Sequence, residues 1–335
     1  MSLINDTENH ASVSVVGMAK NTGKTTCLNF LIHCFREKQK TIAITSIGVD
    51  GEERDVLYDM PKPRITLHKD TIFITSEQHY AEKEIPTEML AISKRSTPLG
   101  RLITARALDS GKVILSGPSD SAWLREIIAE MPPLGVSLTL VDGALSRMSS
   151  ASPAVTEAVV LCTGAALTSQ LSELIRRTKF YCHLINSEQA PEPLREKLFS
   201  LENGVWLLDE YGTENMIASS VFTFSNEMNT FPKKNDVIFA SGAVTDSFLK
   251  TLCISKAKGI TLIVSDFSKL FILPVTYDRF IRLGGKLQVL RKTKLIAVCT
   301  NPVSPEGIRL NSIMLRDEMQ QALQIPVYDI HLETL

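Results

Sequence analysis

The stretch that decides the fold is SVSVVGMAKNTGKTTCLNFL, residues 12–31. It opens with Ser12–Val16, an apolar and β-branched run that predicts a buried strand. It closes with apolar residues at helical spacing, which predict a helix over residues 24–38. Between them lies a short loop that contains Gly17 and Gly23. This order of strand, glycine-containing loop and helix predicts backbone N–H groups that converge on one point.

Such a loop is a phosphate-binding loop, or P-loop, and its parts have separate roles. The helix adds the positive end of its dipole to the inward-facing N–H groups. Gly23 leaves room for phosphates, Lys24 reaches the β- and γ-phosphates, and the Thr25 hydroxyl binds Mg²⁺. A strand–glycine–helix turn without this role is disfavoured, because the Gly-Lys-Thr-Thr tetrad stands in the expected context. The expected nucleotide-binding residues are Gly17, Asn21, Thr22, Gly23, Lys24, Thr25 and Thr26.

Two acidic residues are candidates to complete the site. Asp142 ends the hydrophobic run 136–141, which is where P-loop enzymes hold a Mg²⁺-binding aspartate. A turn aspartate before Gly143 is the alternative, since Asp-Gly is a common turn pair. Asp50 follows the second predicted strand, 41–45, and in this it resembles the acidic residue of dethiobiotin synthetase-like ATPases. That resemblance implies that Asp50 joins the metal or positions the attacking group, and a solvated loop is the alternative. The expected catalytic residues are Lys24, Asp50 and Asp142, and the expected metal ligands are Thr25, Asp50 and Asp142.

The loop departs from the usual spacing, because five residues instead of four separate Gly17 from Gly23. In this it resembles the loop of dethiobiotin synthetase and related ATPases that activate carboxyl groups. Many relatives in that branch carry a signature lysine five residues before the loop lysine. Here that position is Ala19, and Lys20 comes one residue late. We therefore do not assign to Lys20 the role of the signature lysine.

The segment VSVVGMAKNTGKTTCLN, residues 13–29, also resembles the P-loop subunits of lysine 5,6-aminomutase reactivating factors. In those systems an ATPase subunit works with a MutS-like partner to restore an adenosylcobalamin-dependent mutase. The resemblance implies ATP and Mg²⁺ as cofactors, a P-loop NTPase fold, and a protein partner that is the MutS-like subunit, the aminomutase or both. Adenine preference rests on this resemblance and on the missing guanine motif Asn-Lys-x-Asp.

Three functions remain open on the sequence. The first is an ATPase that regulates or reactivates a partner enzyme, through a switch in the loop after Asp50. The second is an ATP-dependent small-molecule ligase or kinase, with its acceptor held near Asp50 and residues 116–120. The third, a non-hydrolysing metallochaperone, ranks last because the sequence has no His or Cys cluster. No arginine stands out as a catalytic finger, so a partner or a second copy in a homodimer could supply one.

Composition narrows the class of protein. The 335 residues carry 36 Lys and Arg against 37 Asp and Glu, a net charge of −1, which gives no general attraction to nucleic acid or anionic membranes. The sequence shows neither a signal peptide nor an apolar run long enough to span a membrane. Its six cysteines are scattered, without C-x-x-C pairs, and indicate buried thiols in a cytoplasmic protein rather than a zinc site.

Short apolar runs alternate with helical stretches along most of the chain. This alternation predicts an α/β fold with a mostly parallel sheet and helices on both faces. We expect a P-loop domain over residues 1–190 and a smaller α/β domain, which could bind a partner, over 191–335. One large sheet through both halves is the alternative. We also expect a β-hairpin over residues 64–75, and a contact with a base or partner, or a plain turn, at Asn301.

Overall fold

The computed structural model describes residues 2–47, 54–55, 60–61, 65–144, 152, 155–208, 212–224, 232–254 and 257–332. The chain divides into two compact units. Unit 1 comprises Met1–Lys179 and Lys294–Leu335, and unit 2 comprises Phe180–Thr293. Within the described ranges, every helix is too short or too polar to cross a membrane.

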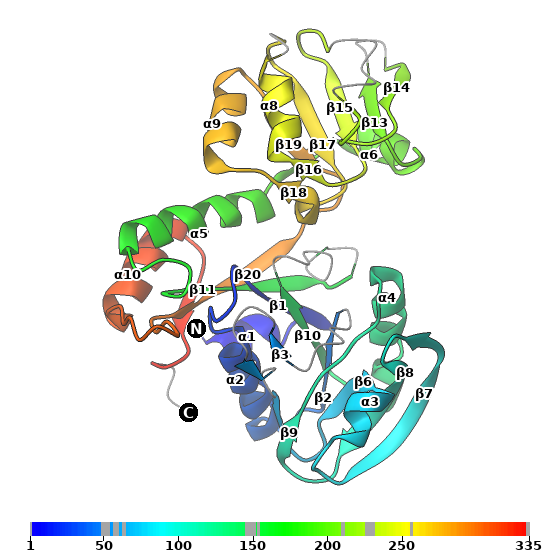
Figure 1. Cartoon of the computed structure of the whole chain (residues 1–335), viewed down its shortest axis with the longest axis vertical. Coiled ribbons are helices and arrows are strands. Elements are labelled where there is room, and N and C mark those ends of the chain that lie inside the picture. The colour runs from blue at the N-terminus through cyan, green and yellow to red at the C-terminus, as the bar shows by residue number, and fades with distance from the viewer. Residues whose placement is uncertain are drawn as a thin grey trace. The chain divides into compact units, whose positions relative to one another are not determined.

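Unit 1 is an α/β structure built on one mixed sheet (Figure 1). The strand order is β21-β20-β11-β1-β10-β2-β6-β8-β7. Neighbours from β21 to β6 run parallel, and β8 and β7 are antiparallel additions at one edge. Its elements are α1 (Leu3–Thr7), β1 (Ser12–Gly17), α2 (Lys24–Glu37), β2 (Ile42–Ser46), β3 (Arg54–Asp55), β4 (Met60–Pro61), β5 (Ile65–Leu67), β6 (Ile72–Ser76), α3 (Glu77–Ala81), β7 (Thr87–Thr97), β8 (Gly100–Ala107), β9 (Gly111–Val113), α4 (Ser121–Ala129), η1 (Pro132–Leu134), β10 (Leu138–Ala144), β11 (Ala158–Gly164), α5 (Leu171–Ile185, which continues into unit 2), β20 (Lys294–Asn301), α10 (Ser312–Leu323) and β21 (Val327–Asp329).

Helices cover both faces of this sheet, as the sequence predicts. The side chain of Leu140 in β10 joins a core cluster that contains Leu28 and Leu31 of α2. The next residue, Val141, joins a different cluster with Leu124 of α4. Successive side chains of a strand point to opposite faces, so α2 and α4 lie on opposite sides of β10.

The strand–loop–helix predicted from residues 12–31 is confirmed. Every residue of β1 is buried, which suits a central strand with parallel neighbours on both sides. Helix α2 buries one face, the residues Cys27, Leu28, Leu31, Ile32, Cys34 and Phe35. This amphipathic spacing fixes the helix against the sheet and thereby sets the position of the loop before it.

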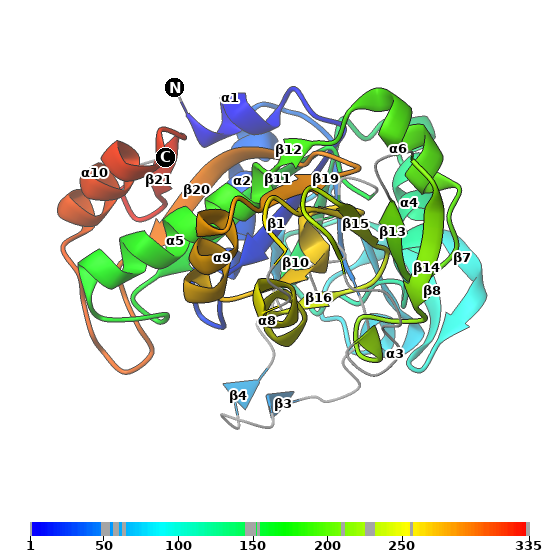
Figure 2. The ribbon, with the colours of Figure 1, turned by 90° about the horizontal axis from the view of Figure 1, so that it is seen from above.

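The structure divides the chain differently from the expected boundary near residue 190. Strands β20 and β21 return to unit 1, where β20 pairs with β11. Both views show α10 and β21 beside β20 (Figures 1 and 2). Unit 2 is therefore an insertion between β11 and β20, two strands that are neighbours in the sheet of unit 1. The sequence gives no local sign of this return, because the pairing joins segments more than a hundred residues apart.

The hairpin predicted over residues 64–75 is wrong. Strand β5 pairs with β9, whereas β6 pairs with β2 and β8. Asp70 turns the chain in a left-handed conformation, with φ of 69°, but its N–H bonds to Ala107 instead of closing a two-stranded turn. The hairpin near this edge is β7–β8, joined at Pro98 and Leu99. Its outer strand has exposed residues on both faces and so lacks the alternation that marks a strand.

Unit 2 is a smaller α/β structure with a sheet of order β12-β19-β17-β15-β13-β14. From β12 to β15 the neighbours are parallel, and β13 and β14 complete the sheet in antiparallel pairings. Its elements are β12 (Glu188–Gln189), α6 (Glu192–Phe199), β13 (Val205–Leu208), β14 (Glu214–Ala218), β15 (Val237–Ala240), β16 (Val244–Thr245), α8 (Asp246–Ile254), β17 (Thr261–Val264), η3 (Phe267–Lys269), β18 (Leu270–Phe271), α9 (Pro274–Arg282) and β19 (Lys286–Val289).

Candidate nucleotide-binding site

The P-loop is a tight backbone turn between β1 and α2. Asn21 and Gly23 both have left-handed backbone conformations, with φ of 61° and 91°. The buried Thr22 hydroxyl lies between them in sequence and donates a hydrogen bond of 2.9 Å to the carbonyl of Ala19. A Cβ atom on Gly17 would lie 2.8 Å from that same hydroxyl oxygen, so the loop requires glycine there. Two left-handed residues thus close a loop that is one residue longer than usual.

The first turn of α2 supplies the donors of the site. The N-cap residue is Gly23, which has no side chain to cap the helix. The N–H groups of the first helical turn, residues 24–26, therefore have no intrahelical acceptor and carry the positive end of the helix dipole. Thr25 is partly exposed and Thr26 is exposed, so both are accessible at this helix terminus.

Lys24 and Asp142, both predicted as site residues, meet at this terminus. The Nζ atom of Lys24 lies 2.8 Å from Oδ1 of Asp142, and their side chains are 25% and 20% exposed. The contact is an ion pair, and among the described residues Oδ1 accepts no further hydrogen bond. The geometry brings a cation and a carboxylate together where phosphate and Mg²⁺ would bind.

Asp142 is not a turn residue, the alternative that its Asp-Gly sequence left open. It lies inside β10, opposite Val15 of β1 on one side and Ser46 of β2 on the other. The hydroxyl of Ser46 donates a 3.3 Å hydrogen bond to the backbone carbonyl of Asp142. Pairing on both sides fixes the backbone of this carboxylate beside the strand that leads into the P-loop.

Asn301, at the end of β20, holds the loop from a third strand. Its side-chain Nδ2 donates a 3.1 Å hydrogen bond to the carbonyl of Asn21. Its Oδ1 accepts a bond of 3.2 Å from the N–H of Val303, which fixes the orientation of the amide. A Cβ atom on Gly23 would come within 2.9 Å of Asn301 Cβ. This residue is thus a contact of the P-loop itself, a role that the sequence did not identify.

The loop over residues 116–120 lies beside the end of β2. A Cβ atom on Gly117 would lie 1.6 Å from the carbonyl oxygen of Ser46, so only glycine allows this approach. Ser116 is buried and its hydroxyl bonds to the imidazole Nδ1 of His79. At its other end, Asp120 caps α4 by accepting a hydrogen bond from the N–H of Trp123. These contacts fix a second loop at the same edge as Asp142.

Asp50, the other predicted carboxylate, lies outside the described residues, so its place in the site stays a prediction. The described part of the site therefore comprises the P-loop, Asp142, Asn301 and the loop at Gly117.

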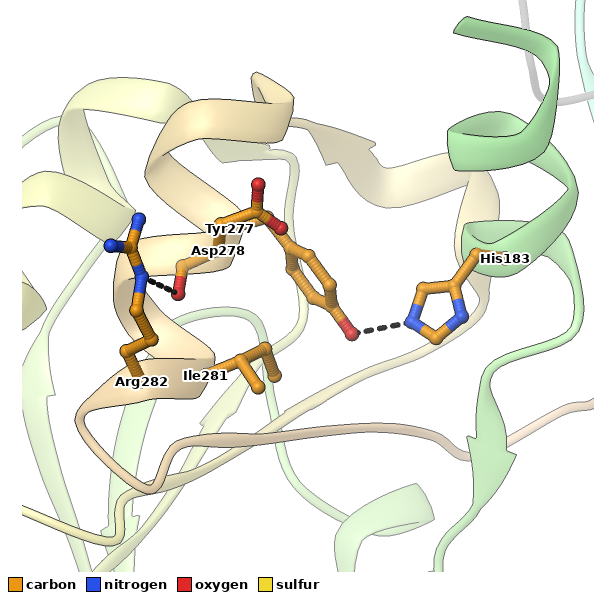
Figure 3. A pocket seen from close by; sticks show the side chains of 5 residues that line it. All are labelled: His183, Tyr277, Asp278, Ile281 and Arg282. Atoms are coloured by element: carbon orange, nitrogen blue, oxygen red, sulfur yellow. Dashed lines mark hydrogen bonds between the residues drawn. The ribbon is translucent and has the colours of Figure 1, made fainter. Parts of the chain in front are cut away.

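Unit 2 contains a separate pocket of about 400 Å³ (Figure 3). Tyr277 of α9 and His183 of α5 meet across it, with Tyr277 Oη 2.6 Å from His183 Nε2. Burial raises the pKa of Tyr277 above its usual value. The lining residues are His183, Tyr277, Asp278, Ile281 and Arg282. The sequence gives no sign of this pocket, because His183 and Tyr277 are 94 positions apart and neither belongs to a motif.

Comparisons with protein-family models, with curated proteins and with solved structures gave no match. The function therefore has to be argued from the geometry of the site.

Proposed function

We infer that this chain binds MgATP at the P-loop and hydrolyses it to regulate or reactivate a partner enzyme. The observation that carries the nucleotide part is the 2.8 Å approach of Lys24 to Asp142 at the N-terminus of α2. A P-loop ATPase needs these groups together, one for the phosphates and one for Mg²⁺. The wider architecture supports the same reading, since a central parallel strand leads directly into the loop.

The residues present fit the metal–nucleotide group. Asp142 Oδ1 is buried, and among the described residues its charge is balanced by Lys24, so a bound cation would take the place of that lysine. Bound Mg²⁺ would neutralise charge on the phosphates. Lys24 would leave Asp142 to contact the phosphates, and Thr25 would present its hydroxyl from the first turn of α2. The N–H groups of that turn would receive phosphate oxygens.

The partner part of the proposal rests on the resemblance of residues 13–29 to subunits of aminomutase reactivating factors. The expected partner is a MutS-like subunit, an adenosylcobalamin-dependent aminomutase, or both. The proposal predicts slow hydrolysis by the isolated chain and faster hydrolysis with the partner present.

A ligase or kinase that uses a small-molecule acceptor is the second candidate. The loop at Gly117 favours it, since this loop packs on Ser46 beside the strand that carries Asp142. Such a loop could form the wall of an acceptor site. This candidate predicts rapid turnover that saturates with a small acceptor and needs no protein partner.

The test is calorimetric titration of MgATP and MgGTP into the wild-type chain, Lys24→Ala and the control Lys20→Ala. Loss of the charged hydrogen bonds from Lys24, worth roughly 1.5–3 kcal/mol, should weaken ATP binding by about 10- to 100-fold. Lys20→Ala removes the same kind of charge from the same loop. Because no phosphate contact is assigned to Lys20, this variant should bind ATP like the wild type.

Three results would contradict the proposal. Equal ATP affinity in wild type and Lys24→Ala would remove the P-loop assignment. An equal loss in Lys24→Ala and Lys20→Ala would show a general charge effect instead of a specific lysine. Fast turnover on a small acceptor, without any partner protein, would support the ligase or kinase instead of the partner-regulating ATPase.

A further inference from the structure

Three buried cysteines from separate parts of the sequence meet beneath the P-loop. Cys27 lies in the first turns of α2, Cys162 in β11 and Cys299 in β20, and all three are at most 2% exposed. Their sulfur atoms lie within 4.8 Å of one another, and those of Cys27 and Cys299 are 3.6 Å apart. Among the described residues, no other three His, Cys, Asp or Glu side chains bring their donor atoms together in this way.

The spacing of the sulfur atoms suits a three-coordinate metal ion. A metal–thiolate bond of about 2.3 Å in a trigonal plane places the sulfurs about 4.0 Å apart. The 3.6 Å separation is a little shorter and the 4.8 Å limit a little longer than this distance. Shifts of the sulfur positions by at most about 0.8 Å would therefore give this spacing.

The donor set selects the kind of ion. Thiolates prefer soft ions such as Cu(I) and Zn²⁺. Structural zinc is almost always held by four ligands, whereas this group offers three sulfurs in a buried position. We propose that Cys27, Cys162 and Cys299 form a binding site for a soft monovalent ion, Cu(I), beneath the P-loop.

Lys24, which is paired with Asp142, lies beside the thiolates that this site requires. Lys24 precedes Cys27 by three positions on α2, so the two side chains are neighbours on one face of the helix. The N-terminal end of the helix dipole adds to the same region. Binding replaces three S–H bonds by three copper–sulfur bonds and releases three protons. Copper enters and stays as Cu(I), so no oxidant or reductant is needed.

The ion would join three elements that support the nucleotide site. It would tie the first turns of α2 to β11, whose Cys162 carbonyl accepts the N–H of Met18, and to β20, which ends in Asn301. The competing explanation is that three small thiols merely fill the core around Leu28 and Val160. That explanation predicts no preference of this group for copper over the other buried cysteines.

The experiment titrates Cu(I) into the reduced full-length chain under anaerobic conditions, in competition with the coloured Cu(I) chelator bicinchoninate. We expect one Cu(I) per chain in the wild type. Cys162→Ala should weaken binding by at least about 100-fold, because losing even an outer partner of a ligand costs 10- to 100-fold. The matched control replaces the other buried cysteines, Cys34, Cys182 and Cys253, with alanine together and should retain full affinity.

X-ray absorption of the copper-loaded wild type gives a second measurement that does not depend on whether a variant folds. Three sulfur neighbours at one distance would support the site. Fewer than three sulfurs, or equal copper affinity in the wild type and in Cys162→Ala, would overturn it.

Discussion

Lys24 and Asp142 form an ion pair in the structure. Under the proposed function, Lys24 would instead contact the phosphates and Asp142 would instead bind Mg²⁺. In the structure they satisfy one another at 2.8 Å, both partly shielded from solvent. Binding of a metal–nucleotide would exchange this one pair for two new ones, lysine with phosphate and aspartate with metal. Under the proposed function, Mg²⁺ would therefore help the nucleotide in two ways, by neutralising phosphate charge and by releasing the lysine from its carboxylate.

Asp142→Asn should separate these two effects. The amide keeps the shape of the side chain but loses the charge that holds Lys24 and that would hold Mg²⁺. We expect the gain in ATP affinity on adding Mg²⁺ to fall from about 10-fold or more to nearly none. Calorimetry of ATP with and without Mg²⁺ measures this gain.

Asp120→Asn is the control for the loss of a charge in unit 1. Asn caps a helix about as well as Asp, so this change at the N-cap of α4 should preserve both stability and the response to Mg²⁺. An unchanged Mg²⁺ response in Asp142→Asn would exclude Asp142 as a metal ligand.

The sequence predicts a residue of this site only where a local sequence pattern indicates it. Asp142 was predicted because a hydrophobic strand ends at it, and Lys24 because it follows Gly23 before a helix. A strand end also drew attention to Asn301, as a contact with a base or partner or as a plain turn, but its bond to Asn21 joins positions 280 residues apart and has no local pattern. A side chain that acts through a long-range contact becomes recognisable only when the strand order is known.

At the scale of elements, the N-terminus of α2 depends on one backbone conformation. Gly23 has φ of 91°, and its missing Cβ leaves space for Asn301. An L-residue here would meet both a backbone cost and a close contact. The close packing of the loop against β20 therefore depends on the absence of a side chain at Gly23.

Gly23→Ala should destabilise the chain and remove nucleotide binding. The left-handed conformation costs about 1–2 kcal/mol for a residue with a Cβ, and the 2.9 Å approach to Asn301 adds to it. Gly135→Ala is a matched control, because Gly135 has φ of 80° but no atom within 4 Å of its added Cβ.

The control should lose only the conformational part of the stability and bind ATP normally. Thermal unfolding and ATP titration of both variants measure the difference. Equal losses of stability, with ATP binding intact in both, would show that the contact with Asn301 has no role.

The elements differ in how well a sequence can predict them. Buried central strands such as β1 and β10 are rich in Val and Leu, and the sequence predicts them close to their observed limits. Strand β7 was missed because it lies at an edge, where both of its faces are largely exposed. The partner of β5 was misassigned because a turn signal at Asp70 shows that the chain bends, and not which strand it pairs with.

At the scale of the whole molecule, the insertion of unit 2 means that strands which are neighbours in the sheet of unit 1 are far apart in the sequence. The last strands of unit 1, β20 and β21, come after the whole of unit 2 in the sequence. Each unit has its own sheet, which is the usual condition for a domain that can fold alone. The α/β class was predicted correctly, whereas an insertion of this kind leaves no local mark in the sequence.

Removing Glu188–Lys292 should therefore leave a chain that still binds ATP. A linker of about ten Gly and Ser residues, with a mean reach of about 17 Å, would join α5 to β20. We expect MgATP affinity within about 3-fold of the wild type, measured by calorimetry, because the described site residues all lie in unit 1.

The comparison is a chain that ends at residue 190, the boundary expected from the sequence. It lacks β20, β21 and Asn301, and exposes an edge of β11, so it should fail to unfold cooperatively or to bind ATP. Normal binding by this shorter chain would mean that β20 is not needed for the site.

The outermost strand of unit 1 also affects how copies of the molecule behave in concentrated solution. β7 ends the strand order, so one side of its backbone faces away from β8. Its pairing with β8 is broken by two irregularities, and Lys94 and Arg95 are exposed along it. An irregular strand that carries exposed charged side chains is a poor template for a neighbouring chain. This edge of the sheet is thus protected against pairing with a strand of another molecule.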